Sequence, residues 1–239
     1  MILSACSPPP KVAVIERATA DERVVIDKIG GSHIRIVQPG DTLHAIAFAN
    51  RLNVNDLAAW NQLEDTSKLR VSRRIRLTRP VAFTPKTKLE KNTGRISDRS
   101  NGLTKSNSSK LVDTSKQKSV WHWPTQGKVI TRFAANSSQQ GIDIEGLLGQ
   151  PVVATSAGEV VYVGNGLKGY GNLVIIKHSE KYLSAYAYNQ ETFVREGQKV
   201  SASYRIANLG KNKQQRNALH FQIRVNGQPV DPLKYLAIQ

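Results

Sequence analysis

Apolar residues follow two different periods along this chain, and the change of period separates its parts. Between residues 33 and 78, apolar positions first alternate at 33–37 and then recur three and four residues apart from Leu43 onward. A second stripe with helical spacing starts after Asn53, and alternation returns at 74–77. Alternation is typical of half-buried strands, and the three-and-four spacing of amphipathic helices. The pattern therefore predicts a small module with the order strand, helix, helix, strand.

Residues 120–239 carry short apolar runs separated by glycine-containing turns. Runs of this length predict the strands of an all-β sandwich or barrel. The predicted strands lie at 128–133, 151–155, 158–163, 172–178, 182–188, 205–209 and 219–225. With the helical module, the expected fold class is α+β with more than one domain.

Residues 79–119 lie between these two parts and show neither period. Ser, Lys, Asn and Thr dominate from residue 86 onward, and apolar residues there are isolated. Such a stretch cannot bury enough surface to offset the entropy of ordering it, so we predict a disordered linker. Ten basic and three acidic residues make the linker strongly basic.

The whole chain has 239 residues and a formal net charge of +16. Such a surplus favours polyanionic partners such as nucleic acid, anionic lipid or acidic cell-wall polymer, or keeps a charged linker solvated. No nucleic-acid recognition motif accompanies the charge, so we expect no nucleic-acid partner. No apolar run approaches the ~18 residues of a membrane-spanning helix. A single Cys excludes a disulfide framework.

The stretch VQPGDTLHAIAFANRLNVNDLAAWNQL resembles LysM modules, which are βααβ domains that bind the N-acetylglucosamine units of peptidoglycan. The resemblance covers 33–78, although Val71-Ser72-Arg73-Arg74 replaces the usual Pro-Gly pair before the last strand. It implies a sugar groove lined by two turns, whose residues are Gly40, Asp41, Thr42, Leu43, Asn61, Gln62 and Leu63. The same residues could serve only to cap helices and turn the chain.

The segment that starts with GIDIEGLLGQPVVATSAGEVVYVG and continues to DPLKYL resembles the LytM-type zinc endopeptidases, relatives of lysostaphin, over nearly all of 120–239. Members of that family hold zinc with the His and Asp of an H-x-x-x-D element and the last His of an H-x-H element. Two further His residues assist the zinc-bound water. The resemblance implies a mainly-β fold and shows where such a site would lie.

The residues of the site are mostly replaced in this chain. Asp143 and His220 match the family, whereas Gln139, Tyr188 and Ala218 stand where the family has His. Catalytic zinc normally needs three protein ligands and a water, so we expect no metal, no cofactor and no peptidase activity. We expect Asp143 and His220 either to hold two loops together by a hydrogen bond or, with the other three, to line a partner-binding cleft less polar than a zinc site.

A LysM module joined to a degenerate LytM-type domain resembles the NlpD-like family of murein hydrolase activators. The resemblance implies a non-enzymatic protein that binds peptidoglycan and activates an N-acetylmuramyl-L-alanine amidase during cell division and daughter-cell separation. The expected location is the division septum, on the outer membrane and facing the periplasm. Two alternatives stay open: a zinc metalloendopeptidase that cleaves peptidoglycan cross-bridges, and a passive cell-wall-binding lipoprotein.

Residues 1–32 contain one further motif. Leu3-Ser4-Ala5-Cys6 resembles the lipobox of bacterial lipoproteins, in which the signal peptide is removed before the Cys and the thiol is acylated. The resemblance implies a lipid anchor at Cys6, and Ser7 in place of Asp implies sorting to the outer membrane. Five residues cannot form a signal peptide, so this interpretation needs an earlier start codon. The alternative is a free Cys in a disordered tail.

Overall fold

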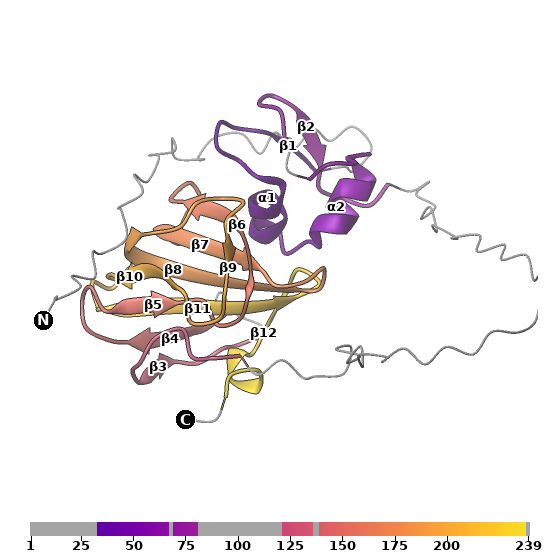
Figure 1. Ribbon diagram of the computed structural model, residues 1–239. Coiled ribbons are helices and arrows are strands. Elements are labelled where there is room, and N and C mark those ends of the chain that lie inside the picture. Colours follow the sequence, from indigo (N-terminus) through magenta and orange to yellow (C-terminus); the bar gives the residue numbers. More distant parts are fainter. Residues whose placement is uncertain (1–32, 67–68, 81–120, 136–138, 238–239) are drawn as a thin grey trace, which may run out of the picture.

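The computed structural model describes residues 33–66, 69–80, 121–135 and 139–237, which form two packed modules (Figure 1). The predictions for residues 1–32, including lipidation of Cys6, lie outside this part of the chain. So does the prediction of a disordered linker for most of 79–119. None of the helices in the described ranges is both long and apolar enough to cross a bilayer.

The smaller module has the order that the apolar pattern predicts. Its elements are β1 (Ile34–Ile36), α1 (Leu43–Ala49), α2 (Val54–Trp60) and β2 (Arg74–Arg76). The two strands pair antiparallel. Thr42 caps α1, because its Oγ1 accepts a hydrogen bond from the Ala45 amide at 3.0 Å, and Asn53 caps α2 in the same way. The caps fix where both helices start, so that Leu57 packs with Ile75 in a core of their own.

The larger module is an antiparallel sheet with the order β3-β4-β11-β8-β7-β6-β9, to which β10, β5 and β12 are attached. Its elements are β3 (Val129–Thr131), β4 (Ile142–Glu145), β5 (Pro151–Val153), β6 (Gly158–Gly164), β7 (Asn172–Lys177), β8 (Tyr182–Thr192), β9 (Lys199–Val200), β10 (Arg205–Leu209), β11 (Ala218–Val225), β12 (Gln228–Val230) and the 3-10 turn η2 (Pro232–Lys234). The expected mainly-β fold is confirmed. The apolar pattern missed β4, β9 and β12, which have two to four residues and lie outside the longer apolar runs that it used.

The central strands give the sheet two different faces, since successive side chains point in opposite directions. On one face, Val174, Tyr186 and Phe221 belong to the main core of the module. On the other face, Ile175 and Ala185 belong to a second apolar layer. We call this second surface the outer face.

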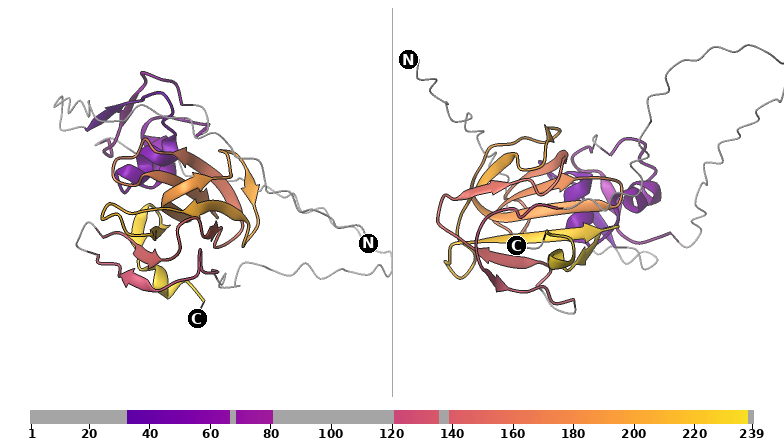
Figure 2. Two further views of the ribbon diagram at one scale, coloured as in Figure 1. Left: turned by 90° about the vertical axis from the view of Figure 1, so that its left-hand side faces the viewer. Right: turned by 60° about the horizontal axis from the view of Figure 1, so that its bottom comes forward.

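The smaller module packs against the outer face through α1. Ala45 and Phe48 join the second apolar layer, and each is only 1% exposed. Arg224 of β11 lies against Phe48: its guanidinium carbon is 3.5 Å from the ring centre, and its Nη1 donates to the Phe48 carbonyl at 2.6 Å. Burial of a Phe side chain contributes roughly 2–3 kcal/mol. In each view of Figures 1 and 2 the two modules lie against each other.

Candidate functional site

Asp143 and His220 face each other across neighbouring strands of the outer face. β4 and β11 run antiparallel with Asp143 directly opposite His220, so both side chains project from the same side of the sheet. His220 Nδ1 and Asp143 Oδ1 are 2.6 Å apart, and both residues are buried. The expected hydrogen bond between them is therefore present, although it joins two strands rather than two loops.

Gln222 continues this hydrogen-bonded chain on β11. Its Oε1 accepts hydrogen bonds from the Arg224 guanidinium at 3.0 and 3.2 Å, which fixes the orientation of its amide. Its Nε2 therefore faces His220 Nε2, at 2.9 Å. Since the Gln222 amide nitrogen can only donate, His220 Nε2 accepts and Nδ1 carries the proton that bonds Asp143. A protein hydrogen bond thus occupies each nitrogen of the imidazole.

Opposing effects act on the Asp143 carboxyl. Burial acts to raise its pKa, but hydrogen bonds from His220, Thr131 and Gln139 outweigh it. The pKa of Asp143 is therefore below its ordinary value. The carboxyl is ionised at neutral pH and already bonded to donors within the protein.

Tyr188 lies beside this pair at an unusual backbone angle, φ 62°. Its hydroxyl donates to the Gly169 carbonyl at 3.0 Å, and its ring centre is 6.0 Å from that of His220. Burial raises the pKa of Tyr188, and the nearby Asp143 raises it further. The phenol therefore keeps its proton at neutral pH and acts as a hydrogen-bond donor.

A hollow of about 280 Å³ opens beside these residues. We call it the cleft, and its lining consists of Gln139, Asp143, Lys168, Gly169, Tyr170, Tyr188, Lys213, Gln214, His220 and Gln222. Four of the five expected cleft positions are thus brought together. Ala218 is fully buried and does not line the hollow. The expectation of a less polar cleft was wrong, because two Lys and three Gln side chains surround it.

The cleft residues do not fit a zinc ion. Asp143 and His220 are the cleft-lining residues of a type that binds zinc, and each is hydrogen-bonded to the other. The described part of the chain holds no group of three His, Cys, Asp or Glu residues that could bind a metal. Lys168 and Lys213 add positive charge beside the pair. A Zn²⁺ site needs a third protein ligand that this arrangement lacks.

The first turn expected to bind glycan precedes α1. Asp41 accepts from the Arg35 guanidinium at 3.0 Å, Thr42 caps the helix, and Leu43 is fully buried. Gly40, by contrast, is exposed. Most side chains in this turn hold the chain in place, so the exposed backbone beside Gly40 is the part that a sugar could reach.

The second expected turn follows α2. The Asn61 side chain accepts from the Arg76 amide at 2.7 Å and donates to the Arg76 carbonyl at 2.9 Å, which ties this turn to β2. Gln62 is exposed at φ 53°, and Leu63 is partly buried against the core. Gln62 is therefore the side chain of this turn that is open to a ligand.

Several cleft residues were not expected from the sequence. Tyr170, Lys168 and Lys213 come from loops, and no motif marked them. Gln222 had a signal that was not used: it follows His220 by two residues on a strand, and a period of two places both on one face. His178 lies outside the cleft and bonds the Ala157 carbonyl and the Ser184 hydroxyl.

Comparison with known proteins identifies both modules. The LysM domain family matches residues 36–78, and peptidase family M23 matches residues 137–232. The chain is 38% identical over 263 residues to the lipoprotein NlpD/LppB homolog of Pseudomonas aeruginosa, covering 98% of this chain and 88% of that protein. It is 52% identical over 124 residues to the murein hydrolase activator NlpD of Escherichia coli (strain K12), covering 52% of this chain and 33% of that protein.

Among solved structures, a zinc-containing peptidase from Vibrio cholerae is similar to 47% of this chain and 39% of its own, with a TM-score of 0.44 and 25% identity. The relative from Pseudomonas aeruginosa matches almost the full length of both chains. With its LysM module followed by an M23-type module, this chain belongs to the NlpD/LppB family of lipoproteins.

Proposed function

We propose that this protein is a non-enzymatic activator of a peptidoglycan N-acetylmuramyl-L-alanine amidase, acting in cell division and daughter-cell separation. The observation that carries the proposal is the hydrogen-bonded chain Asp143–His220–Gln222, which uses both imidazole nitrogens within the protein. Without an available ligand set or general base, the cleft has no means to activate water. The Escherichia coli relative, which matches about half of this chain, is named a murein hydrolase activator.

An activator of this kind works by shifting a population. It must bind the active conformation of the amidase better than the inactive one, and a preference of about 1.4 kcal/mol changes their ratio tenfold. The cleft suits that task because its residues are held in place before binding. Gln222, for example, is fixed by Arg224 on one side and contacts the Tyr170 hydroxyl at 3.4 Å on the other. A preorganised surface loses little entropy on binding.

The LysM module would hold the activator on peptidoglycan, the polymer on which the amidase acts. Its two turns, at 40–43 and 61–63, would bind N-acetylglucosamine units of peptidoglycan. A lipid anchor at Cys6 would place the protein on the outer membrane, facing the periplasm at the division septum. The names of relatives support the outer-membrane anchor, since they include a lipoprotein NlpD/LppB homolog and an outer membrane antigenic lipoprotein B of Haemophilus influenzae.

The test is to add the purified full chain to the periplasmic amidases of its own bacterium on purified sacculi, and to measure release of stem peptides. The proposal expects a higher rate with the protein than without it. No change in rate with any of these amidases would instead favour a passive wall-binding protein.

A zinc endopeptidase is the enzymatic rival. Metal analysis of the purified full chain, combined with an assay for cross-bridge cleavage in the absence of amidase, separates the two. Stoichiometric zinc together with cleavage that stops on chelation would overturn the proposal.

A further inference from the structure

The outer face carries a line of side chains that runs past the cleft in both directions. On β11, Arg224, Gln222, His220 and Ala218 follow one another with a period of two. The register places Ala218 opposite Glu145 of β4. Neighbours in this line are about 6–7 Å apart along the strand. The cleft at His220 therefore lies partway along this line of largely buried side chains, and the two ends of the line differ in what covers them.

The LysM module closes one end of this surface. Phe48 of α1 packs over Arg224, and its ring centre is 5.5 Å from that of Tyr170, a lining residue of the cleft. Arg224 is four residues from His220 along β11, which corresponds to about 13 Å. A partner segment that extended from the cleft in this direction would meet α1 within that distance.

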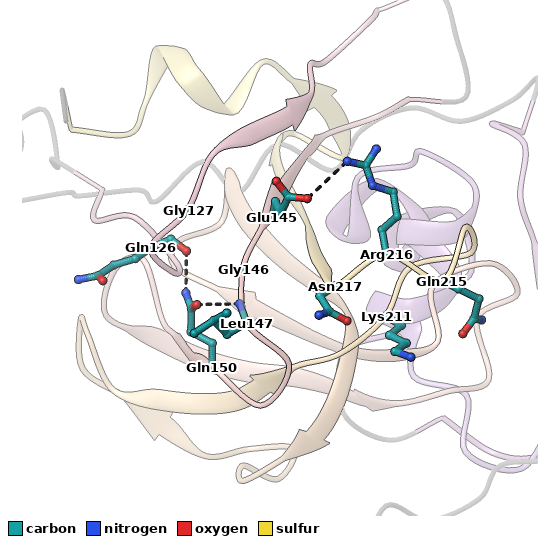
Figure 3. A pocket seen from close by; sticks show the side chains of 10 residues that line it. All are labelled: Gln126, Gly127, Glu145, Gly146, Leu147, Gln150, Lys211, Gln215, Arg216 and Asn217. Atoms are coloured by element: carbon teal, nitrogen blue, oxygen red, sulfur yellow. Dashed lines mark hydrogen bonds and ion pairs between the residues drawn. The ribbon is translucent and has the colours of Figure 1, made fainter.

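The opposite end is open. A second hollow, of about 680 Å³, lies between the β4–β5 turn and the β10–β11 loop (Figure 3). The same loop borders both hollows, because Lys213 and Gln214 line the cleft while Lys211 and Arg216 line the second hollow. A partner bound in the cleft can therefore reach this hollow across the loop that borders both, without crossing the LysM module.

The β4–β5 turn presents leucine side chains to solvent. Leu147 is 76% exposed and Leu148 is 49% exposed. The turn is nevertheless held firmly: Gln150 Oε1 accepts from the Leu147 amide at 3.0 Å, and its Nε2 donates to the Gln126 carbonyl at 2.6 Å (Figure 3). Adjacent exposed leucines on a fixed turn offer apolar contact area at little cost in ordering.

The loop beside these leucines is basic. Lys211, Lys213 and Arg216 fall within six residues that include no acidic side chain. Arg216 lies 3.4 Å from Glu145, an exposed pair that is worth little on its own. The local charge therefore attracts carboxylates, and the leucines beside it attract an apolar side chain.

We infer that the second hollow is the outer half of the surface that docks the amidase, and that its occupant is a partner segment with an apolar side chain flanked by carboxylates. The inference rests on the proposed function. It adds that the partner extends from the cleft toward Leu147, because Phe48 covers the outer face on the other side of the cleft. Contacts in the outer half strengthen docking, whereas the cleft itself changes the conformation of the amidase.

The test uses the full chain, the amidase of its own bacterium and purified sacculi, with stem-peptide release measured over a range of activator concentrations. Leu147→Asp and Lys211→Glu should each raise the concentration for half-maximal stimulation about tenfold, with the maximum unchanged at saturation. Tyr204→Asp and Lys199→Glu are matched controls, because both residues are exposed and line neither hollow. All four positions are on the surface, so equal thermal midpoints verify folding.

The outcomes separate the two proposals. If the unmodified chain gives no stimulation, the proposed function is wrong and this inference with it. The unmodified chain could stimulate the amidase while Leu147→Asp and Lys211→Glu reach half-maximal stimulation at the same concentration as the unmodified chain. In that case only the inference is overturned. It is also overturned if the two control variants shift the concentration as much as the test variants do.

Discussion

Tyr188 is the cleft residue whose substitution best separates the two activities proposed for this chain. Glu at this position would lose the hydroxyl bond to Gly169 and place a second carboxylate beside Asp143. Two close carboxylates repel, so the cleft would no longer keep its arrangement. We expect Tyr188→Glu to lower the maximal amidase stimulation about tenfold or more. The measurement is stem-peptide release from sacculi at saturating protein.

The same variant should bind sacculi as well as the unmodified chain, because Tyr188 lies in the larger module and the wall contact in the LysM module. Tyr204→Glu is the control for an added charge on an exposed tyrosine outside the cleft. Stimulation that persists with Tyr188→Glu would place the partner surface elsewhere.

His44 gives the chain a dependence of stability on pH. Burial, mainly, and the nearby Lys177 lower its pKa from 6.5 to about 4, against the opposite effect of Glu180. In the part of the chain that the structure describes, His44 Nε2 has no hydrogen-bond partner. Since the folded state binds the proton less readily than the unfolded state, this contribution is complete above pH 6.5 and falls as the pH drops toward 4.

The expected loss over that range is about 3 kcal/mol of the free energy of unfolding. Denaturant titrations at about pH 7.5 and about pH 4.5 measure it, because that free energy falls linearly with denaturant. His44→Leu should flatten the dependence, whereas His33→Leu, at an exposed position, should leave it unchanged. If the free energy of unfolding of His44→Leu depended on pH as steeply as that of the unmodified chain, another group would be responsible.

Motif spacing found four of the cleft residues and missed Gln222, although Gln222 lies on the same strand as His220. Asp143 and His220 matched a family pattern, and Gln139 and Tyr188 were found as departures from it. Tyr170 could not be found in this way, because it reaches the cleft from a loop whose path depends on the packed fold. A motif records positions along the chain, whereas the polarity of the cleft depends on which loops close around it.

At the scale of elements, apolar period predicted both helices and the longer strands. One signal was not used: β7 reads Leu173-Val174-Ile175-Ile176, an unbroken apolar run. Alternation would indicate one buried face, whereas an unbroken run indicates burial on both. The second face of β7 is the one that packs with Ala45 and Phe48 of the LysM module. The sequence therefore carried evidence of the contact between modules, but not of which element makes it.

A single turn tests that contact. Asn226 and Gly227 both have positive φ, 51° and 82°, in the tight turn between β11 and β12. A Cβ at Gly227 would lie 2.2 Å from the Leu52 carbonyl oxygen, between the two helices of the LysM module. Gly227→Ala should therefore push the modules apart. Gly197→Ala is the matched control, because Gly197 has φ 78° and no atom within 4 Å of its Cβ position.

Hydroxyl-radical footprinting with mass spectrometry measures the result in the full chain. We expect Phe48, 1% exposed, to be oxidised several-fold faster in Gly227→Ala, and at the original rate in Gly197→Ala. Tyr186, fully buried in the main core, should stay protected in every variant. The packed interface would be contradicted if Phe48 in the unmodified chain reacted as fast as exposed Tyr204.

At the scale of the whole molecule, two forces of different kinds should hold the chain on the cell wall. The LysM turns would recognise sugar through short hydrogen bonds, which salt weakens little. The net charge of +16, of which +7 lies at 79–119 (ten basic and three acidic residues), would attract acidic wall polymer over a longer range. Raising the salt from about 0.05 M to about 0.5 M shortens the screening length from more than ~10 Å to less than ~5 Å.

Co-sedimentation with sacculi separates these two forces. We expect the salt rise to weaken binding several-fold without abolishing it, and soluble N-acetylglucosamine oligomers to compete for the binding that remains. Replacing Lys86, Lys88, Lys91 and Lys105 with Gln should make binding to sacculi less sensitive to added salt. Replacing the same four residues with Arg should leave the salt-dependent loss of binding unchanged. If the Gln variant lost as much binding in high salt as the Arg variant, the basic segment would have no part in wall attachment. The charge that brings the protein to the wall would then have to lie in the folded modules.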